Sequence, residues 1–120
     1  MAKKPVVKVW GLKTCGTTRK ALKFLDSRKT PYEFIDVRES PPPKTLVKKA
    51  AARISEPRKL LNTSGGAYRE GGWKDKAPKM TKTEIIQAVT AEPMLMKRPL
   101  VVSSKGATIG FDQDALNSIL

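Results

Sequence analysis

The sequence predicts an α/β fold in which a β-α-β half and a β-β-α half are separated by a helical segment. The first half is indicated by a β-branched strand at 6–10, an amphipathic helix at 16–28 and a second strand at 32–37. A hairpin with strands at 100–102 and 108–111 and a short final helix indicate the second half. Together they predict a four-stranded mixed sheet, because a β-α-β crossover pairs its strands in parallel and a hairpin does not.

Local residue patterns support each element of the first half. The first strand is β-branched and aromatic and ends at Gly11. In the helix that follows, apolar residues such as Leu22 and Leu25 recur at helical spacing, and lysines and arginines fill the other face. Pro31 ends this helix, after which aromatic and apolar residues alternate with acids, as in a half-buried strand.

The middle of the chain predicts a helical insertion at about 40–95. Ser40 is the expected N-cap of its first helix, ahead of three consecutive prolines. Residues 62–80 carry four glycines, one proline and several cations, which predicts a mobile surface stretch. Thr81 and Glu84 have the spacing of a capping box for the last helix of the insertion. In the second half, an aspartate after the hairpin is the expected cap of the final helix.

Length and composition limit the class of protein. A chain of 120 residues predicts one domain over 1–120. No apolar run approaches the ~18 residues that span a bilayer, and the apolar stretch near the N-terminus is too short for a signal peptide. The chain has one cysteine and no histidine, so it can form no internal disulfide and no histidine-containing metal site. We expect a cytoplasmic monomer that binds neither a metal nor a membrane.

The formal net charge of +13 is unevenly distributed. Residues 1–30 contain nine Lys and Arg against one Asp, so they carry +8 of that total. The charge gathers around the cysteine, which predicts capture of an anionic substrate there, although a basic surface also keeps a protein soluble. A nucleic-acid interface is not favoured, because the few aromatic residues are scattered rather than interleaved with the cations.

Cys15 lies where the first strand passes into the first helix. Free N–H groups and the positive end of the helix dipole stabilise a thiolate at this position, and Arg19 and Lys20 add positive charge within the same turn. The sequence therefore predicts that Cys15 has a pKa well below that of a free thiol and acts as a nucleophile. The alternative is a buried, inert cysteine, which the polar and basic neighbours disfavour.

Four short segments, in this order, resemble one family. They are residues 15–21 (CGTTRKA), 60–63 (LLNT), 97–100 (KRPL) and 109–111 (IGF). The combination resembles the ArsC/Spx family of arsenate-reductase-like proteins from the first strand to the C-terminus. This resemblance implies a thioredoxin-like fold with a helical insertion between its halves, a catalytic cysteine matched by Cys15, and an active-site arginine matched by Arg98. It also implies a cis peptide bond before Pro99.

Departures from the family pattern narrow the expected chemistry. Arsenate reductases of this family use three arginines, and here only Arg98 matches, with Asn62 and Phe111 at the other two positions. Spx regulators carry Cys-x-x-Cys, and here the second position is Thr18. The resemblance is therefore strongest to a single-cysteine subgroup associated with glutathione-dependent thiol reduction. No cofactor is expected to be bound, and glutathione is the expected cosubstrate.

The sequence and the resemblance together predict a thiol oxidoreductase. Cys15 would attack a disulfide, a glutathione adduct or arsenate, and glutathione or a glutaredoxin would resolve the product. Arg98 would hold the anion, and the residues expected to help bind substrate are Gly16, Thr17, Thr18, Arg19, Asn62, Arg69 and Pro99. The alternative from another class is an Spx-like, non-catalytic regulator that binds the C-terminal domain of the RNA polymerase α subunit.

Overall fold

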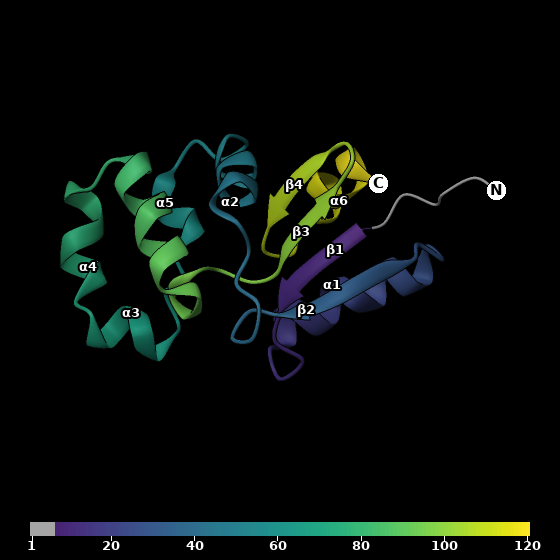
Figure 1. The fold of residues 1–120 in the computed structure, drawn as a ribbon, viewed down its shortest axis with the longest axis horizontal. Coiled ribbons are helices and arrows are strands. Elements are labelled where there is room, and N and C mark those ends of the chain that lie inside the picture. The colour runs from purple at the N-terminus through teal and green to yellow at the C-terminus, as the bar shows by residue number, and fades with distance from the viewer. Residues whose placement is uncertain (1–6) are drawn as a thin grey trace.

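The computed structural model describes residues 7–120 and contains a four-stranded mixed sheet (Figure 1). Its strands are β1 (Val7–Gly11), β2 (Tyr32–Asp36), β3 (Leu100–Ser103) and β4 (Gly106–Ile109), in the order β2-β1-β3-β4. β1 runs parallel to β2 and antiparallel to β3, and β3 and β4 form a hairpin. The predicted β-α-β and β-β-α halves are therefore confirmed.

The described residues also form six α-helices and three short 3₁₀ helices. The α-helices are α1 (Gly16–Ser27), α2 (Lys44–Ala51), α3 (Gly66–Glu70), α4 (Trp73–Lys76), α5 (Lys82–Ala91) and α6 (Gln113–Ile119). The 3₁₀ helices are η1 (Pro57–Leu60), η2 (Ala77–Lys79) and η3 (Pro93–Leu95). All except α1 and α6 lie between β2 and β3, inside the range expected for the helical insertion. None of the helices in residues 7–120 is long and apolar enough to cross a membrane.

The alternating side chains of β1 divide the core between the two faces of the sheet. Val7 and Val9 pack with Leu25 of α1 and with residues of α6. Trp10 points to the opposite face and packs with buried residues of α2 and α5. Helices therefore cover both faces, with α1 and α6 on one side and the insertion on the other. Val6, which we expected to begin the first strand, lies outside the described residues.

Two predicted helix caps are confirmed by hydrogen bonds. The backbone N–H of Glu84 donates to Thr81 Oγ1 at 3.2 Å, and the backbone N–H of Thr81 donates to Glu84 Oε1 at 2.8 Å. This reciprocal pair is the capping box of α5. At the start of α6, the backbone N–H of Ala115 donates to Asp112 Oδ1 at 3.2 Å. Both helices thus begin where local side-chain chemistry predicted.

The predicted cap of the insertion's first helix is wrong. Ser40 does not cap α2, because the residue that precedes this helix is Pro43, in an extended conformation. Proline disfavours the helical conformation of the residue before it, so a run of three prolines keeps residues 40–42 out of the helix, and none of them is helical. The helix therefore starts only after the last proline.

The stretch at 62–80, which we expected to be a mobile surface segment and no part of the core, contains α3, α4 and η2, and some of its residues pack on the core. These helices form through apolar contacts with the core, which the glycines and cations of the segment do not indicate in the sequence. Tyr68 and Trp73 are partly buried and pack against the core, and Ala77 is fully buried. Tertiary packing, rather than helix propensity, accounts for these short helices.

Gly11 is required by close packing at the end of β1. A Cβ atom at Gly11 would lie 2.7 Å from both Cγ2 and Oγ1 of Thr18, whose side chain is fully buried. We expect Gly11→Ala to lower the free energy of unfolding by about 1–3 kcal/mol, because the added methyl group displaces a packed side chain. Chemical denaturation measures this change.

Gly16→Ala is the matched control, since a Cβ atom at Gly16 would meet no other atom within 4 Å. This variant should be neutral or slightly stabilising because alanine favours the helix. Equal losses of stability in the two variants would contradict the packing argument.

Candidate active site

Cys15 immediately precedes α1 and occupies its N-cap position. A tight turn leads to it from the end of β1, and the Cys15 N–H donates to the Leu12 carbonyl at 2.9 Å. The Cys15 carbonyl in turn accepts from the N–H of Arg19 at 3.0 Å, which starts the hydrogen bonding of the helix. The side chain is only partly buried, so the sulfur is both placed at the helix N-terminus and accessible.

The pKa of the Cys15 thiol is lowered from its ordinary value. Burial of the sulfur is the largest single influence and raises the pKa. Hydrogen bonds that favour the thiolate outweigh it, and they come from the backbone and hydroxyl of Thr18, the backbone of Thr17 and the side chain of Arg98. The predicted activation of Cys15 thus has a physical cause in the first turn of α1 and one arginine.

Thr18 holds the first turn of α1 against β1. It is completely buried, and its Oγ1 accepts a hydrogen bond from the Leu12 N–H at 3.4 Å. Because the hydroxyl oxygen is the acceptor in that bond, its proton remains available for the sulfur of Cys15. Thr18 therefore supports the thiolate from the position at which a Cys-x-x-Cys protein has its second thiol.

Two further segments of the chain, one around Asn62 and one around Arg98, lie beside Cys15. Leu61 and Met96 form an isolated antiparallel bridge. On either side of it, the Asn62 N–H donates to the Leu95 carbonyl and the Lys97 N–H donates to a backbone carbonyl of η1, both at 2.8 Å. These bonds place the segments around Asn62 and Arg98 next to each other.

Sheet topology brings Arg98 to Cys15. β1 and β3 are antiparallel neighbours in which Trp10 pairs with Leu100. The last residues of β1 and the first residues of β3 therefore lie at the same end of the sheet. The chain leaves β1 toward Cys15 and enters β3 from Arg98 through a cis bond to Pro99, as the family resemblance implied.

The Arg98 side chain is held by a hydrogen bond but keeps one donor nitrogen without a partner among residues 7–120. One terminal nitrogen donates to the Met94 carbonyl at 3.3 Å. Its Nε is buried and has no hydrogen-bond partner among residues 7–120. An unpaired buried donor is costly, and an anion in the adjacent cavity would satisfy it.

A cavity of about 310 Å³ opens beside the cysteine and is called the cysteine cavity below. Its lining combines a thiol, two cations and several polar side chains: Cys15, Thr17, Leu61, Asn62, Thr63, Ser64, Lys97 and Arg98. It has the size of a small-ligand site, and its cations and polar side chains could fix an anion next to the sulfur. Among residues 7–120 there is no group of three or more His, Cys, Asp or Glu residues placed to hold a metal ion.

The structure brings four of the expected site residues to the cysteine cavity: Cys15, Thr17, Asn62 and Arg98. The other five do not line it. Gly16, Thr18 and Pro99 are neighbours in sequence of residues that line it, and the two remaining arginines are each hydrogen-bonded to a backbone carbonyl. Arg19 donates to the Lys13 carbonyl and Arg69 to the Ser64 carbonyl, each at 3.2 Å.

Sequence reasoning missed three polar lining residues, Thr63, Ser64 and Lys97. A signal was present for two of them, because Thr63 lies inside the quoted LLNT segment and Lys97 directly precedes Arg98. No quoted segment includes Ser64. Phe111 has a different place from the one expected for a substituted arginine. Its ring packs edge-to-face on Phe24 of α1, with 6.0 Å between the ring centroids, and it does not line the cysteine cavity.

Comparisons with known proteins agree with this architecture. The ArsC family model matches residues 10–119. An uncharacterized Bacillus subtilis protein, YusI, is 36% identical over 101 residues, which cover 83% of this chain and 86% of that protein.

Two solved structures have the same fold. The structure of an ArsC-family-related protein from Bacteroides fragilis superposes with a TM-score of 0.83 at 27% identity and covers 95% of this chain and 98% of its own. One described as a possible arsenate reductase from Streptococcus mutans gives a TM-score of 0.80 at 30% identity, with 95% and 99% covered. The mixed sheet with its helical insertion is thus the thioredoxin-like fold of these proteins, and the chain belongs to the ArsC family.

Proposed function

We propose that the protein is a single-cysteine thiol reductase that uses glutathione or a glutaredoxin as its external reductant. The Cys15 thiolate attacks one sulfur of a disulfide, so that a mixed disulfide forms and the other sulfur leaves as a thiolate. An external thiolate then attacks the mixed disulfide, which releases Cys15 and forms a disulfide between the external thiol and the substrate. A second external thiolate attacks that disulfide and releases the substrate as a thiol. Two thiols are oxidised to one disulfide for each substrate disulfide that is reduced.

One observation carries this proposal: hydrogen bonds at the start of α1 lower the pKa of the Cys15 thiol, and Thr18 occupies the position of a second thiol. The chain has no other cysteine, so no intramolecular disulfide can complete a catalytic cycle. The resolving thiol must come from another molecule. Glutathione suits the cysteine cavity, because Lys97 and Arg98 can bind carboxylates and Asn62, Thr63 and Ser64 can bind peptide groups.

The cavity supports a disulfide or a glutathione adduct as substrate better than arsenate. Arsenate reduction is suggested by the description of the Streptococcus mutans relative. A tetrahedral oxyanion, however, requires several directed donors, and only Lys97 and Arg98 bring positive charge to the cavity. Asn62 offers an uncharged amide at the position of a family arginine.

We further propose that the protein works as a monomer in the cytoplasm. Its single thiol needs a reducing compartment, in which glutathione keeps it available for reaction. No membrane or nucleic acid takes part in the reaction as proposed.

The direct test is incubation with oxidised glutathione followed by measurement of the intact mass. The wild-type protein should gain one glutathionyl group, and Cys15→Ser should gain none. In a coupled assay with glutathione and glutaredoxin, arsenate should be reduced slowly or not at all. Absence of an adduct on the wild type would contradict the reductase proposal, and it is the result expected of an Spx-like docking module, which does not need the thiol.

Thr18→Val tests the source of the thiolate's stability. Valine keeps the shape of threonine but removes the hydroxyl that lowers the pKa of Cys15, so the pKa should rise. The ultraviolet absorbance of the thiolate, followed against pH, measures this. Thr17→Val is the matched control, because Thr17 acts through its backbone and the pKa should stay the same. Equal shifts in both variants would contradict the assigned role of the Thr18 hydroxyl.

Arg98→Lys tests the anion-binding role of the guanidinium. Lysine keeps the charge but loses the planar fork, so activity per folded molecule should fall by about tenfold or more, equivalent to about one charge-assisted hydrogen bond. Arg69→Lys, outside the cysteine cavity, should retain activity. Melting temperature and turnover are measured on both variants. Full activity in Arg98→Lys together with a lower melting temperature would make Arg98 a structural residue.

A further inference from the structure

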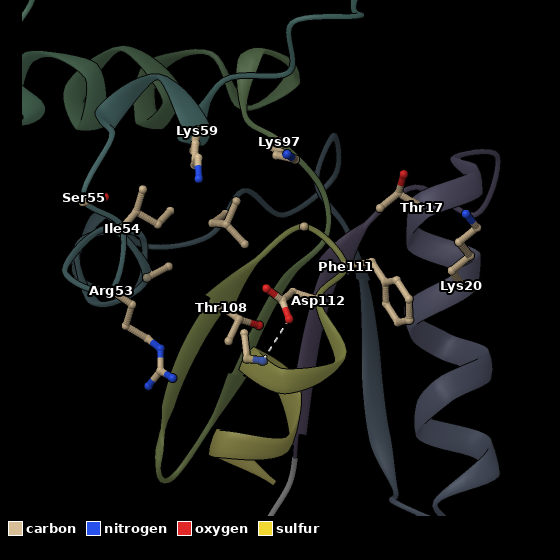
Figure 2. Close-up of a pocket in the computed structure, with 14 residues that line it drawn as sticks. Thr17, Lys20, Arg53, Ile54, Ser55, Lys59, Lys97, Thr108, Phe111 and Asp112 are labelled. Carbon is tan, nitrogen blue, oxygen red and sulfur yellow. Dashed lines mark hydrogen bonds between the residues drawn. The ribbon is translucent and has the colours of Figure 1, made fainter.

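A second and larger cavity lies next to the cysteine cavity. It has a volume of about 650 Å³ and is lined by residues of α1, α2, the segment through η1, and the stretch from β4 to α6 (Figure 2). We call it the basic cavity. Thr17 and Lys97 line both cavities, so a ligand in the basic cavity lies directly beside the approach to Cys15. The proposed reaction gives this space no role.

The basic cavity is strongly cationic. Four cations line it, Lys20, Arg53, Lys59 and Lys97, and they come from four separate segments of the chain. None of them takes part in an ion pair within residues 7–120. In Figure 2 the amino group of Lys59 extends from η1 into the space between the insertion and the sheet.

A single acid, Asp112, lines the same cavity, and its Oδ1 already accepts the capping N–H of Ala115. One engaged carboxylate against four cations leaves the cavity with an excess of positive charge. An anion is therefore the class of ligand that it favours.

Thr108 provides an independent sign of a ligand. It is 4% exposed, and its Oγ1 has no hydrogen-bond partner among residues 7–120. Thr108 nevertheless lines the basic cavity, and Figure 2 shows its hydroxyl turned inward, on the side of Asp112. A buried hydroxyl without a partner is costly, and an acceptor oxygen bound in the cavity would remove that cost.

Lys97 is held at the border between the two cavities. Its aliphatic stem lies against Gly110, where a Cβ atom would come within 3.1 Å of Lys97 Cε. Gly110 has a φ of +75°, a backbone conformation that favours glycine. Because glycine has no Cβ atom, the Lys97 side chain can also pack closely against it. A ligand that reaches from the basic cavity toward the sulfur would pass Lys97 and the hydroxyl of Thr17.

We propose that the basic cavity binds a phosphate group carried by the thiol or disulfide substrate of Cys15. Three of the four cations are lysines, which bind phosphate as point charges, and the hydroxyls of Thr17 and Thr108 can donate to its oxygens. A dianionic phosphate uses several such donors, whereas a single carboxylate needs fewer. That the ligand is a thiol or disulfide substrate rests on the proposed reductase function. That it carries a phosphate group rests on the basic cavity alone.

Binding is tested first, without any redox chemistry. The protein is titrated with inorganic phosphate and, at equal ionic strength, with acetate, and backbone amide resonances are followed by NMR. Phosphate should give saturable shifts at Lys59, Thr108 and Gly110 and should bind more tightly than acetate. Lys59→Gln and Thr108→Val should each weaken phosphate binding by about five- to tenfold, the loss of roughly one directed hydrogen bond.

Lys74→Gln is the matched control. Lys74 lies on α4, outside the basic cavity, and its replacement removes the same charge. Phosphate affinity should not change in this variant. Equal weakening by Lys59→Gln and Lys74→Gln, or shifts confined to the cysteine cavity, would overturn the proposed site. Thr108→Val should keep or raise the melting temperature of the wild type, because valine removes a buried hydroxyl without a partner, so weaker phosphate binding in this variant would not come from loss of the fold.

The substrate is tested with coenzyme A disulfide and with pantethine, its counterpart without phosphates. Two glutathiones reduce either disulfide to two thiols and become one glutathione disulfide. Lys59→Gln should raise KM for coenzyme A disulfide several-fold and leave KM for pantethine unchanged. Equal KM values for the two disulfides in the wild type, or reduction of neither, would overturn the substrate assignment. If oxidised glutathione still forms its adduct on Cys15, the proposed reductase function stands.

Discussion

The site depends on the hydrogen bonding of the Cys15 sulfur by the first turn of α1. Burial alone would raise the pKa of the thiol, but donors from Thr17, Thr18 and Arg98 outweigh burial and lower it. That turn is fixed by packing, because Thr18 is fully buried against the end of β1 and Gly11 leaves room for it. The reactivity of one atom thus follows from a contact between a strand and a helix.

The rest of the fold places an anion-binding surface around this sulfur. The antiparallel pairing of β1 and β3 brings Arg98 to the edge of the sheet where Cys15 lies. The helical insertion adds the opposite wall through Asn62, whose N–H is held by the Leu95 carbonyl. The insertion therefore supplies one wall of the cysteine cavity, while the sheet determines where the cysteine lies.

Much of this arrangement could be predicted from local patterns. The helix that begins at Gly16, the capping box at Thr81 and the hairpin are each specified by neighbouring residues, so the order of elements followed directly. Cys15 could be identified as a nucleophile because helix termini act over one turn.

The remainder depends on contacts between distant segments. The helices within 62–80 form because Tyr68 and Trp73 pack on the core, which no local pattern reveals. The expected role of Arg69 assumed a flexible loop, but the helix α3 carries this residue and its side chain donates to Ser64. The basic cavity joins residues from four segments and could not be assembled from the sequence alone.

The rate of alkylation of Cys15 by iodoacetamide, measured against pH in the wild-type protein, tests the central claim most directly. Only the thiolate reacts, so the midpoint of the rate profile reports the pKa of Cys15. The account predicts a midpoint below that of free glutathione measured in the same buffer. A midpoint equal to or above that of glutathione would contradict it, because Thr18 and Arg98 would then fail to stabilise the thiolate.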